Sequence, residues 1–287
     1  MASLKAIRNR IRSVRSTQQI TRAMKMVAAA RLRRAQEAIT SARPFVKSME
    51  EVLKDVAARV DLSAHPLLVR RPVKKAEIVV LTSDRGLCGG FNANVLRRVQ
   101  RFLIENEGKY EQVTLRTIGR KGNEFFRRRA VTIRKDHPGM ITKVTYHSAD
   151  GLALELSQLF LSGEVDAVYL CYNEFVSAAT QRVTMAELLP ISPPEAKKGE
   201  TPVDFIYEPG QPELLAALLP RYVTSSMWRA MLESVASEHG ARMSAMDNAT
   251  NNASEMIGKL TLQYNRTRQA GITKELMEIV SGAEALK

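Results

Sequence analysis

The N-terminal sixty residues carry a seven-residue repeat of apolar positions. Counted in sevens from Leu4, the first and fourth places of eight successive heptads are apolar at thirteen of sixteen positions. The exceptions, Gln18, Thr21 and Lys25, are consecutive along this seam. A register kept over eight heptads is typical of a coiled coil. We therefore expect a helix over residues 3–58 that needs a partner helix for its apolar seam.

Pro44 lies inside this repeat. A proline removes one backbone donor and usually kinks a helix. Because the heptad register continues in phase on both sides of Pro44, we expect a bend there and not the end of the helix.

The other end of the chain supplies a partner. Residues 221–287 contain no proline and carry a second stripe at helical spacing. Its members are Leu232, Val235, His239, Arg242, Met246, Ala249, Ala253, Met256 and Leu260, followed in a different phase by Leu262, Ile272, Leu276 and Ile279. We expect the two ends of the chain to form a long antiparallel coiled coil.

Between the two ends, apolar strands alternate with helices. Strands are predicted at 76–83, 113–119, 130–135 and 165–175, helices at 91–107 and 149–163, an antiparallel edge strand at 181–191 and a loop at 192–202. This alternation predicts an α/β fold with an open, mostly parallel, Rossmann-like sheet. The predicted division is a coiled-coil helix over 1–60, a linker over 61–75, the α/β domain over 76–210 and a second coiled-coil helix over 211–287.

Positive charge is concentrated at the N-terminus. The formal net charge is +13, and residues 1–36 contain ten Lys and Arg but no Asp or Glu. Such a segment is typical of a solvated helix face, an Arg-rich transit peptide, or a surface that binds nucleic acid or acidic protein. A transit peptide would not keep a heptad register over fifty residues. A nucleic-acid-binding coiled-coil protein therefore stays as the alternative function.

Composition excludes several other classes of protein. Hydrophobic residues make up 45% of the chain, which excludes disorder over most of its length. Two cysteines, Cys88 and Cys171, are too few for a disulfide framework or a Cys-rich zinc site and suggest a reducing compartment. No run of 18 apolar residues occurs, so we expect no transmembrane segment.

A glycine-rich turn follows the first predicted strand, in the sequence Ser-Asp-Arg-Gly-Leu-Cys-Gly-Gly at 83–90. Turns in this place bind phosphate in many α/β proteins. The spacing of Gly86, Gly89 and Gly90 is neither GxGxxG nor GxxxxGK[ST], which favours a structural turn. A nucleotide-binding enzyme built on this turn remains a third possibility.

Catalytic chemistry has little support in the sequence. Cys88 could be a nucleophile, but no local pattern pairs it with His65, His137, His147 or His239. HExxH and GxSxG are both absent. We expect a chain that is not an enzyme, with no catalytic residue, cofactor or metal site.

Three motifs, in order, resemble the gamma subunit of the F-type ATP synthase, bacterial type. They are IRNRIRSVRSTQQITRAMKMVAAARLRRAQ near the N-terminus, TSDRGLCGGFN after the first strand, and LTLQYNRTRQAGITKELMEIVSGAEAL at the C-terminus. The resemblance covers essentially the whole chain. It implies a rotor shaft whose terminal helices turn inside a ring of three alpha and three beta subunits, coupling proton flow to ATP synthesis or hydrolysis.

The resemblance also implies particular contacts. Met24, Lys25 and Arg242 would lie near acidic levers of the beta subunits, and a beta-subunit loop would grip Arg268 and Gln269. Ile279 and Val280 would sit in an apolar sleeve. Tyr207 and Glu208 would face the c-ring or the epsilon subunit.

The family further implies a place for the protein and for its middle domain. The complex would lie on the cytoplasmic face of the bacterial inner membrane, with the gamma subunit peripheral to it. The middle domain of the family binds no nucleotide, and no nucleic acid is a partner. This chain lacks the inserted loop with a regulatory cysteine pair that photosynthetic versions carry, so we expect no redox switching of that kind.

Overall fold

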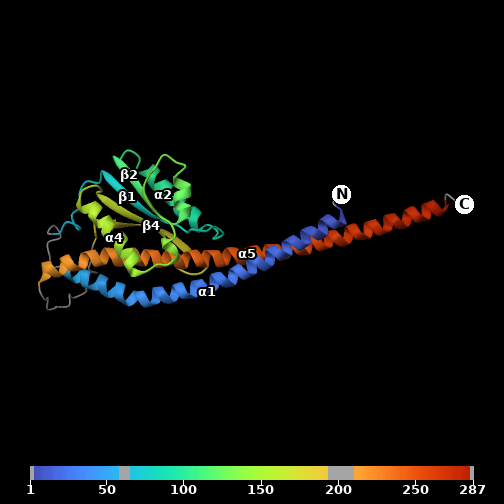
Figure 1. The fold of residues 1–287 in the computed structure, drawn as a ribbon, viewed down its shortest axis with the longest axis horizontal. Helices are drawn as coiled ribbons and strands as arrows, with labels where there is room; N and C mark the ends of the chain where they lie inside the picture. Colours follow the sequence, from blue (N-terminus) through green and yellow to red (C-terminus); the bar gives the residue numbers. More distant parts are fainter. Residues whose placement is uncertain (1–2, 58–64, 193–209, 285–287) are drawn as a thin grey trace, which may run out of the picture. The chain divides into compact units, whose positions relative to one another are not determined.

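The two ends of the chain form its two long helices, α1 (Leu4–Ala57) and α5 (Gln211–Glu284). The computed structural model describes residues 3–57, 65–192 and 210–284 (Figure 1). The chain falls into two compact units, and both helices contribute to each unit. We call residues 1–28 with 243–287 the helical-pair unit, and residues 29–242 the sheet unit. The four ranges predicted from the sequence stay a prediction.

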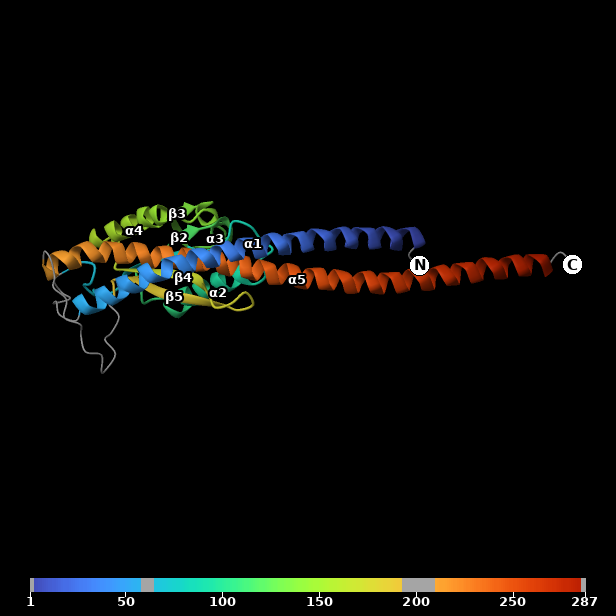
Figure 2. The same ribbon diagram turned by 90° about the horizontal axis from the view of Figure 1, so that it is seen from below.

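In the helical-pair unit, the two segments run antiparallel. Arg8 bonds to Tyr264, whereas Lys25, further along α1, bonds to Asp247, which comes earlier in α5. The α5 segment continues past the start of α1, as both ribbon views show (Figures 1 and 2). The last turns of α5 therefore have no partner helix among the described residues of this unit.

Burial along α1 follows the predicted heptad seam. In the helical-pair unit the buried members are Ile7, Thr21 and Ala28, and in the sheet unit they are Leu32, Ala35, Ile39, Ala42, Val46, Met49 and Leu53. The helix continues through Pro44, which is exposed. An outward-facing proline leaves the seam intact on both sides, and this explains why the register keeps its phase.

The sheet unit is built on five strands, in the order β3-β2-β1-β4-β5. Four strands are parallel neighbours: β1 (Lys75–Leu81), β2 (Gln112–Ile118), β3 (Thr132–His137) and β4 (Ala167–Phe175). The fifth, β5 (Gln181–Leu189), pairs antiparallel with β4 at the edge. The Rossmann-like sheet and its antiparallel edge strand are confirmed.

Helices cover both faces of the sheet. One face packs against α2 (Phe91–Glu105), with Ile78 and Val80 of β1 in that core. The opposite face, which includes Val79 and Leu81, packs against α4 (Tyr146–Leu161) and the first turns of α5 within this unit (Figure 1). Because side chains alternate along a strand, β1 contributes to both cores and is the centre of the unit.

Two features of the sheet unit are not apparent in the sequence. A seven-residue helix, α3 (Arg120–Phe126), follows β2, and a short 3-10 turn, η2 (Met140–Thr142), follows β3.

Glu77, in the apolar run of β1, is fully buried and is paired by Arg116 Nε at 2.7 Å and by Arg134 Nε at 2.9 Å. A buried carboxylate of this kind persists only when cations satisfy it.

Candidate functional site

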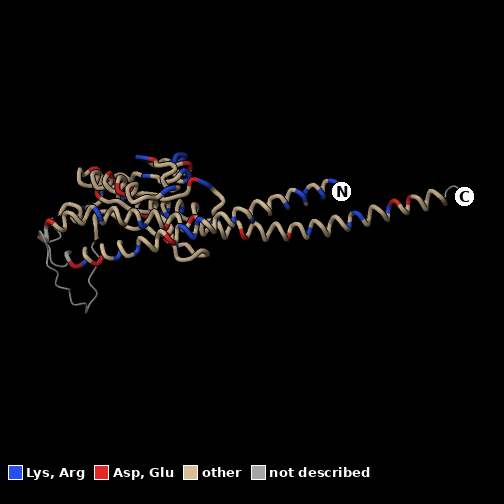
Figure 3. Tube along the Cα trace, turned by 60° about the horizontal axis from the view of Figure 1, so that its bottom comes forward, with Lys and Arg blue, Asp and Glu red and all other residues tan. Residues whose placement is uncertain are grey.

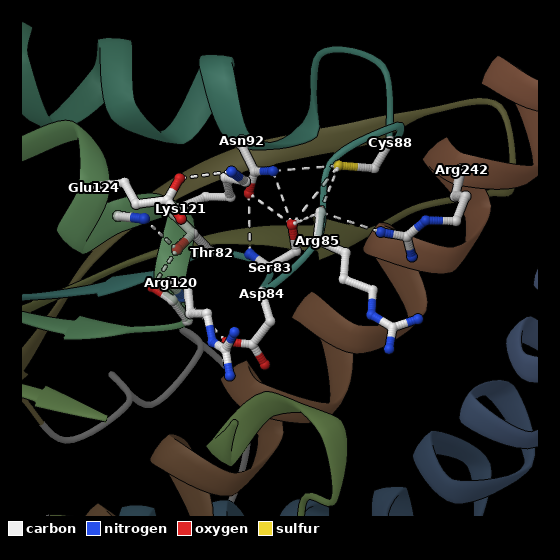
Figure 4. A network of polar contacts seen from close by, with 12 residues as sticks. Thr82, Ser83, Asp84, Arg85, Cys88, Asn92, Arg120, Lys121, Glu124 and Arg242 are labelled. Atoms are coloured by element: carbon white, nitrogen blue, oxygen red, sulfur yellow. Dashed lines mark hydrogen bonds and ion pairs between the residues drawn. The ribbon is translucent and has the colours of Figure 1, made fainter. Parts of the chain in front are cut away.

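The glycine-rich turn is filled by the side chains of its own loop and of the helix that follows. Asn92, in the first turn of α2, accepts a hydrogen bond from the Ser83 backbone N–H at 2.9 Å. It also donates to Ser83 Oγ at 2.8 Å and to Cys88 Sγ at 3.3 Å (Figure 4). Ser83 Oγ donates to the Arg85 carbonyl at 2.6 Å. The backbone N–H at the start of the turn is therefore already satisfied within the protein.

The three glycines of this turn differ in what they do. Gly89 adopts a left-handed φ of 55°, whereas Gly86 has open space around it. A Cβ on Gly90 would meet only the end of the Asn94 side chain, at 3.1 Å. The close backbone approach in this region is at Gly119, where a Cβ would collide with the Thr82 carbonyl oxygen.

The crevice between β1 and β4, where the strand order reverses, also holds protein groups. Ligands of open α/β sheets commonly bind at such a point. Here Asn173 Nδ2 donates to the Phe91 carbonyl at 3.2 Å, and Ser237 Oγ of α5 donates to the Asn173 carbonyl at 3.0 Å. A Cβ on Gly240 would lie 3.2 Å from the Ala178 carbonyl oxygen, so α5 packs closely against the β4–β5 connection. This packing favours the structural interpretation of the turn.

Cys88 sits beneath the turn and is 2% exposed. Its sulfur lies near Ser83, Asn92 and the Arg85 carbonyl, and none of these groups is a general base. Burial raises the pKa of the Cys88 thiol above its usual range. A neutral thiol in this setting is a poor nucleophile.

Lys25 and its neighbours form a polar layer in the helical-pair unit. Lys25 Nζ lies 2.6 Å from Asp247 Oδ1, and the side chains of both residues are a little over 40% exposed. In the next layer of the pair, Thr250 Oγ1 of α5 donates a hydrogen bond to Thr21 Oγ1 of α1 at 2.8 Å. The polar interruption seen in the sequence is therefore matched by polar residues of α5. Met24 beside it is half-buried.

Arg268 and Gln269 are exposed on α5. Ile279 and Val280 are exposed as well, at 72% and 46%. The other large apolar residues exposed on the outside of the helical-pair unit are Ile20, Met26, Val27, Met256, Leu262, Ile272, Leu276 and Met277. Large apolar side chains in contact with water are the kind of surface on which protein partners bind.

The C-terminal stripe differs from the predicted one at Met256 and again beyond Leu260, where the predicted members are all more than half exposed: Leu262, Ile272, Leu276 and Ile279. Met256 was expected in the seam but is 43% exposed, and Ile257 is more buried in its place. The inward positions follow a spacing of four and three through Met246, Thr250, Ala253, Ile257, Leu260 and Tyr264. Tyr264 accepts a hydrogen bond from Arg8 Nη2 at 2.9 Å. A polar tyrosine in an otherwise apolar register is easily missed in a search for hydrophobic residues.

Arg242 is enclosed within the sheet unit, with 9% exposure. Nη1 donates to Glu238 Oε1 at 2.6 Å, while Nη2 donates to the carbonyls of Arg85 at 3.3 Å and Gly86 at 3.2 Å. His239 lies beside it, and burial together with the charge of Arg242 lowers the pKa of His239 to about 4. The Arg242 guanidinium therefore binds groups of its own chain.

Two of the predicted contact residues, Tyr207 and Glu208, lie outside the described residues. Over residues 3–57, 65–192 and 210–284, no three His, Cys, Asp or Glu side chains are grouped to hold a metal ion. No helix among these residues is long and apolar enough to cross a membrane.

Comparison with known proteins gives a consistent result. A family model described as ATP synthase matches residues 3–286. The ATP synthase gamma chain of Anaeromyxobacter sp. (strain Fw109-5) is 60% identical over 291 residues, and that of Geobacter sp. (strain M21) is 51% identical over 287 residues. In both pairs the match covers 100% of each chain.

Solved structures resemble the chain as well. A chain of the central stalk and c-ring structure of Tetrahymena thermophila mitochondrial ATP synthase aligns with a TM-score of 0.60 and 28% identity, covering 80% of this chain and 99% of that one. A chain of the Euglena gracilis enzyme in rotational state 3 has a TM-score of 0.68 at 19% identity, covering 99% and 94%, and shows the fold alone. From the full-length matches and the shared architecture, we conclude that the chain belongs to the ATP synthase gamma chain family.

Proposed function

We propose that this chain is the central rotor of an ATP synthase and couples proton flow through the membrane sector to ATP synthesis or hydrolysis. As a gamma chain it is a non-catalytic subunit of that complex. The relatives give no support to the alternative of a nucleic-acid-binding coiled-coil protein. The proposed partners are three alpha and three beta subunits, the epsilon subunit and the c-ring.

The observation that carries the proposal is the outer surface of the helical-pair unit. Its two helices bury their own seam against each other, yet large apolar side chains such as Ile20, Met26 and Leu276 point outward. The α1 segment adds seven Lys and Arg and no acidic residue, and these charges are visible along the N-terminal helix in Figure 3. A surface both apolar and basic fits a surrounding sleeve of protein with apolar and acidic groups.

The same unit is asymmetric, as a rotor must be. All the charged side chains in residues 4–28 of α1 are basic, whereas residues 243–284 of α5 carry four basic and five acidic side chains. A ring of three identical catalytic subunits would therefore meet a different face of the rotor at each position. Each rotor angle then stabilises a different state of each subunit, and nucleotide occupancy in turn biases the angle.

We propose direct contacts to the beta subunits from Met24 and Lys25 on α1 and from Arg268 and Gln269 on α5. Arg268 and Gln269 have exposed side chains for this purpose. Lys25 keeps part of its surface available beside Asp247. The sleeve around Ile279 and Val280, contacts of Tyr207 and Glu208 with the c-ring, and a place on the cytoplasmic face of the bacterial inner membrane are further parts of the proposal.

Co-expression with the alpha and beta subunits of the same complex tests this function. We expect the chain to co-purify in a particle with three copies of each, and this particle to hydrolyse ATP. The isolated chain should bind labelled ATP no better than background. Tight nucleotide binding by the isolated chain would favour an enzyme, and salt-sensitive binding to DNA in place of ring assembly would favour the nucleic-acid alternative.

A further inference from the structure

The loop between β1 and α2 is strained at its tip and presents side chains outward. Leu87 has a φ of 62°, a left-handed conformation that leucine rarely adopts, and its side chain is 64% exposed. Arg85 beside it is exposed as well. Strain of this kind persists only where the surroundings hold the backbone in place.

The groups that hold this loop come from two sides. On one side, Asn92 of α2 accepts a hydrogen bond from the backbone N–H of Ser83, the first residue of the loop. Asp84 Oδ1 accepts hydrogen bonds from the backbone N–H groups of Arg120 and Gly139, both at 3.1 Å. From α5, Arg242 donates hydrogen bonds to the carbonyls of Arg85 and Gly86 (Figure 4). Ala241 of α5 adds an apolar contact, because it packs in one small cluster with Cys88 and Phe91.

Arg242 is itself fixed in place. Glu238, one turn earlier on α5, accepts a hydrogen bond from Nη1 at 2.6 Å, which leaves Nη2 directed at the two carbonyls. Both side chains are about 90% buried. Charge-assisted hydrogen bonds in such a site are stronger than neutral ones, and the planar guanidinium fork serves two acceptors at once.

We infer that Arg242 is a positioning residue that fastens loop 83–90 to α5, so that Arg85 and Leu87 are carried with the helix as one rigid body. The family resemblance implied that Arg242 contacts a beta subunit directly, whereas its geometry assigns it a role inside the chain. The consequence for rotation rests on the proposed function: torque on the loop tip would pass to α5 through Arg242.

Cys88 provides a direct reporter of this fastening. Its sulfur is buried under the loop and becomes accessible only when the loop opens, while Cys171, 0% exposed in β4, reports opening of the whole sheet unit. We would measure the alkylation rate of each cysteine in the full-length chain by mass spectrometry. In Arg242→Gln, Cys88 should react at least about tenfold faster than in the wild type, equivalent to about 1.4 kcal/mol of easier opening.

A faster reaction could not come from a more reactive thiol. The charge of Arg242 lowers the pKa of Cys88, so its removal alone would make the thiolate rarer and the reaction slower. Arg242→Lys should give an intermediate rate, because an ammonium group cannot serve Glu238 and both carbonyls with the same geometry.

Arg229→Gln is the matched control. Arg229 also lies on α5 in the sheet unit and pairs with Glu50 at 2.7 Å, with no bond to the loop. It should leave the Cys88 rate unchanged. An unchanged Cys88 rate in Arg242→Gln, or an equal rise in Arg229→Gln, would overturn the inference. If Cys171 is exposed together with Cys88 in Arg242→Gln, the Arg242→Lys variant decides, and a wild-type Cys88 rate there rejects the fastening.

The role in coupling is tested in the assembled complex. With Arg242→Gln, ATP hydrolysis should continue while the number of protons pumped per ATP falls, and Arg242→Lys should restore part of it. A wild-type coupling ratio despite a faster Cys88 reaction would reject the torque path while leaving the fastening intact. Failure of the wild-type complex to couple at all would instead reject the proposed function.

Discussion

Among single residues, Gly119 has the most severe steric constraint around the β1–α2 turn. It combines a φ of 93° with contact to the Thr82 carbonyl oxygen, whereas Gly86 has no atom within 4 Å of its Cβ position. Gly119→Ala should lower the free energy of unfolding by about 2–4 kcal/mol, through backbone strain and overpacking. Gly86→Ala, the matched control, should change it by less than about 1 kcal/mol.

Urea unfolding followed by tryptophan fluorescence measures this difference. The chain has a single tryptophan, Trp228, which packs against the core between α4 and α5 in the sheet unit. Equal losses of stability in the two variants would show that Gly119 is under no greater steric constraint than Gly86.

Lys25 has two possible roles, which substitution can separate. Its ion pair with Asp247 is half-exposed and contributes about 0–1 kcal/mol, so Lys25→Met and Asp247→Asn should leave stability nearly unchanged. If Lys25 acts on a beta subunit, Lys25→Met should reduce ATP-driven torque more than Asp247→Asn does. Equal losses of torque would show that Lys25 works only through Asp247.

At the scale of elements, the end of α5 is a helix without an internal partner. Leu276 and Ile279 are 58% and 72% exposed, so replacing both with Ser should change the stability of the isolated chain by less than about 0.5 kcal/mol per site. The same replacement should weaken binding to the alpha–beta ring several-fold, measured by titration of the labelled chain into the ring.

Leu260→Ser is the control for that experiment. Leu260 is 7% exposed in the helical pair, so this substitution should destabilise the isolated chain by about 2–5 kcal/mol. Unchanged ring binding by the Leu276 and Ile279 variant would show that this end of α5 has no apolar sleeve.

The long helices were predictable because a seven-residue period over fifty residues leaves few alternatives. The strands of the sheet were predictable for a similar reason, since their apolar runs alternate with helical spacing. The helix α3 escaped prediction because it has only seven residues and contains Gly122. The partners of Arg242 were equally hidden, because backbone carbonyls more than 150 positions away leave no mark on the local pattern.

At the scale of the whole molecule, most of the net positive charge of the chain lies near its N-terminus. Ten of its Lys and Arg fall in the acid-free residues 1–36, and all ten lie on α1. As a bulk value, +13 fits nucleic acid or lipid as well as protein. On a helix that also exposes Ile20, Met26 and Val27, it fits an acidic and apolar protein sleeve better than a phosphate backbone.

Single-molecule rotation tests the central claim most directly. A bead attached to an exposed site of the sheet unit, in a surface-fixed complex of this chain with its alpha and beta subunits, would report the angle of the chain during ATP hydrolysis. The account predicts rotation in one direction, in steps set by the three catalytic subunits. ATP turnover at the normal rate with a stationary bead would contradict it.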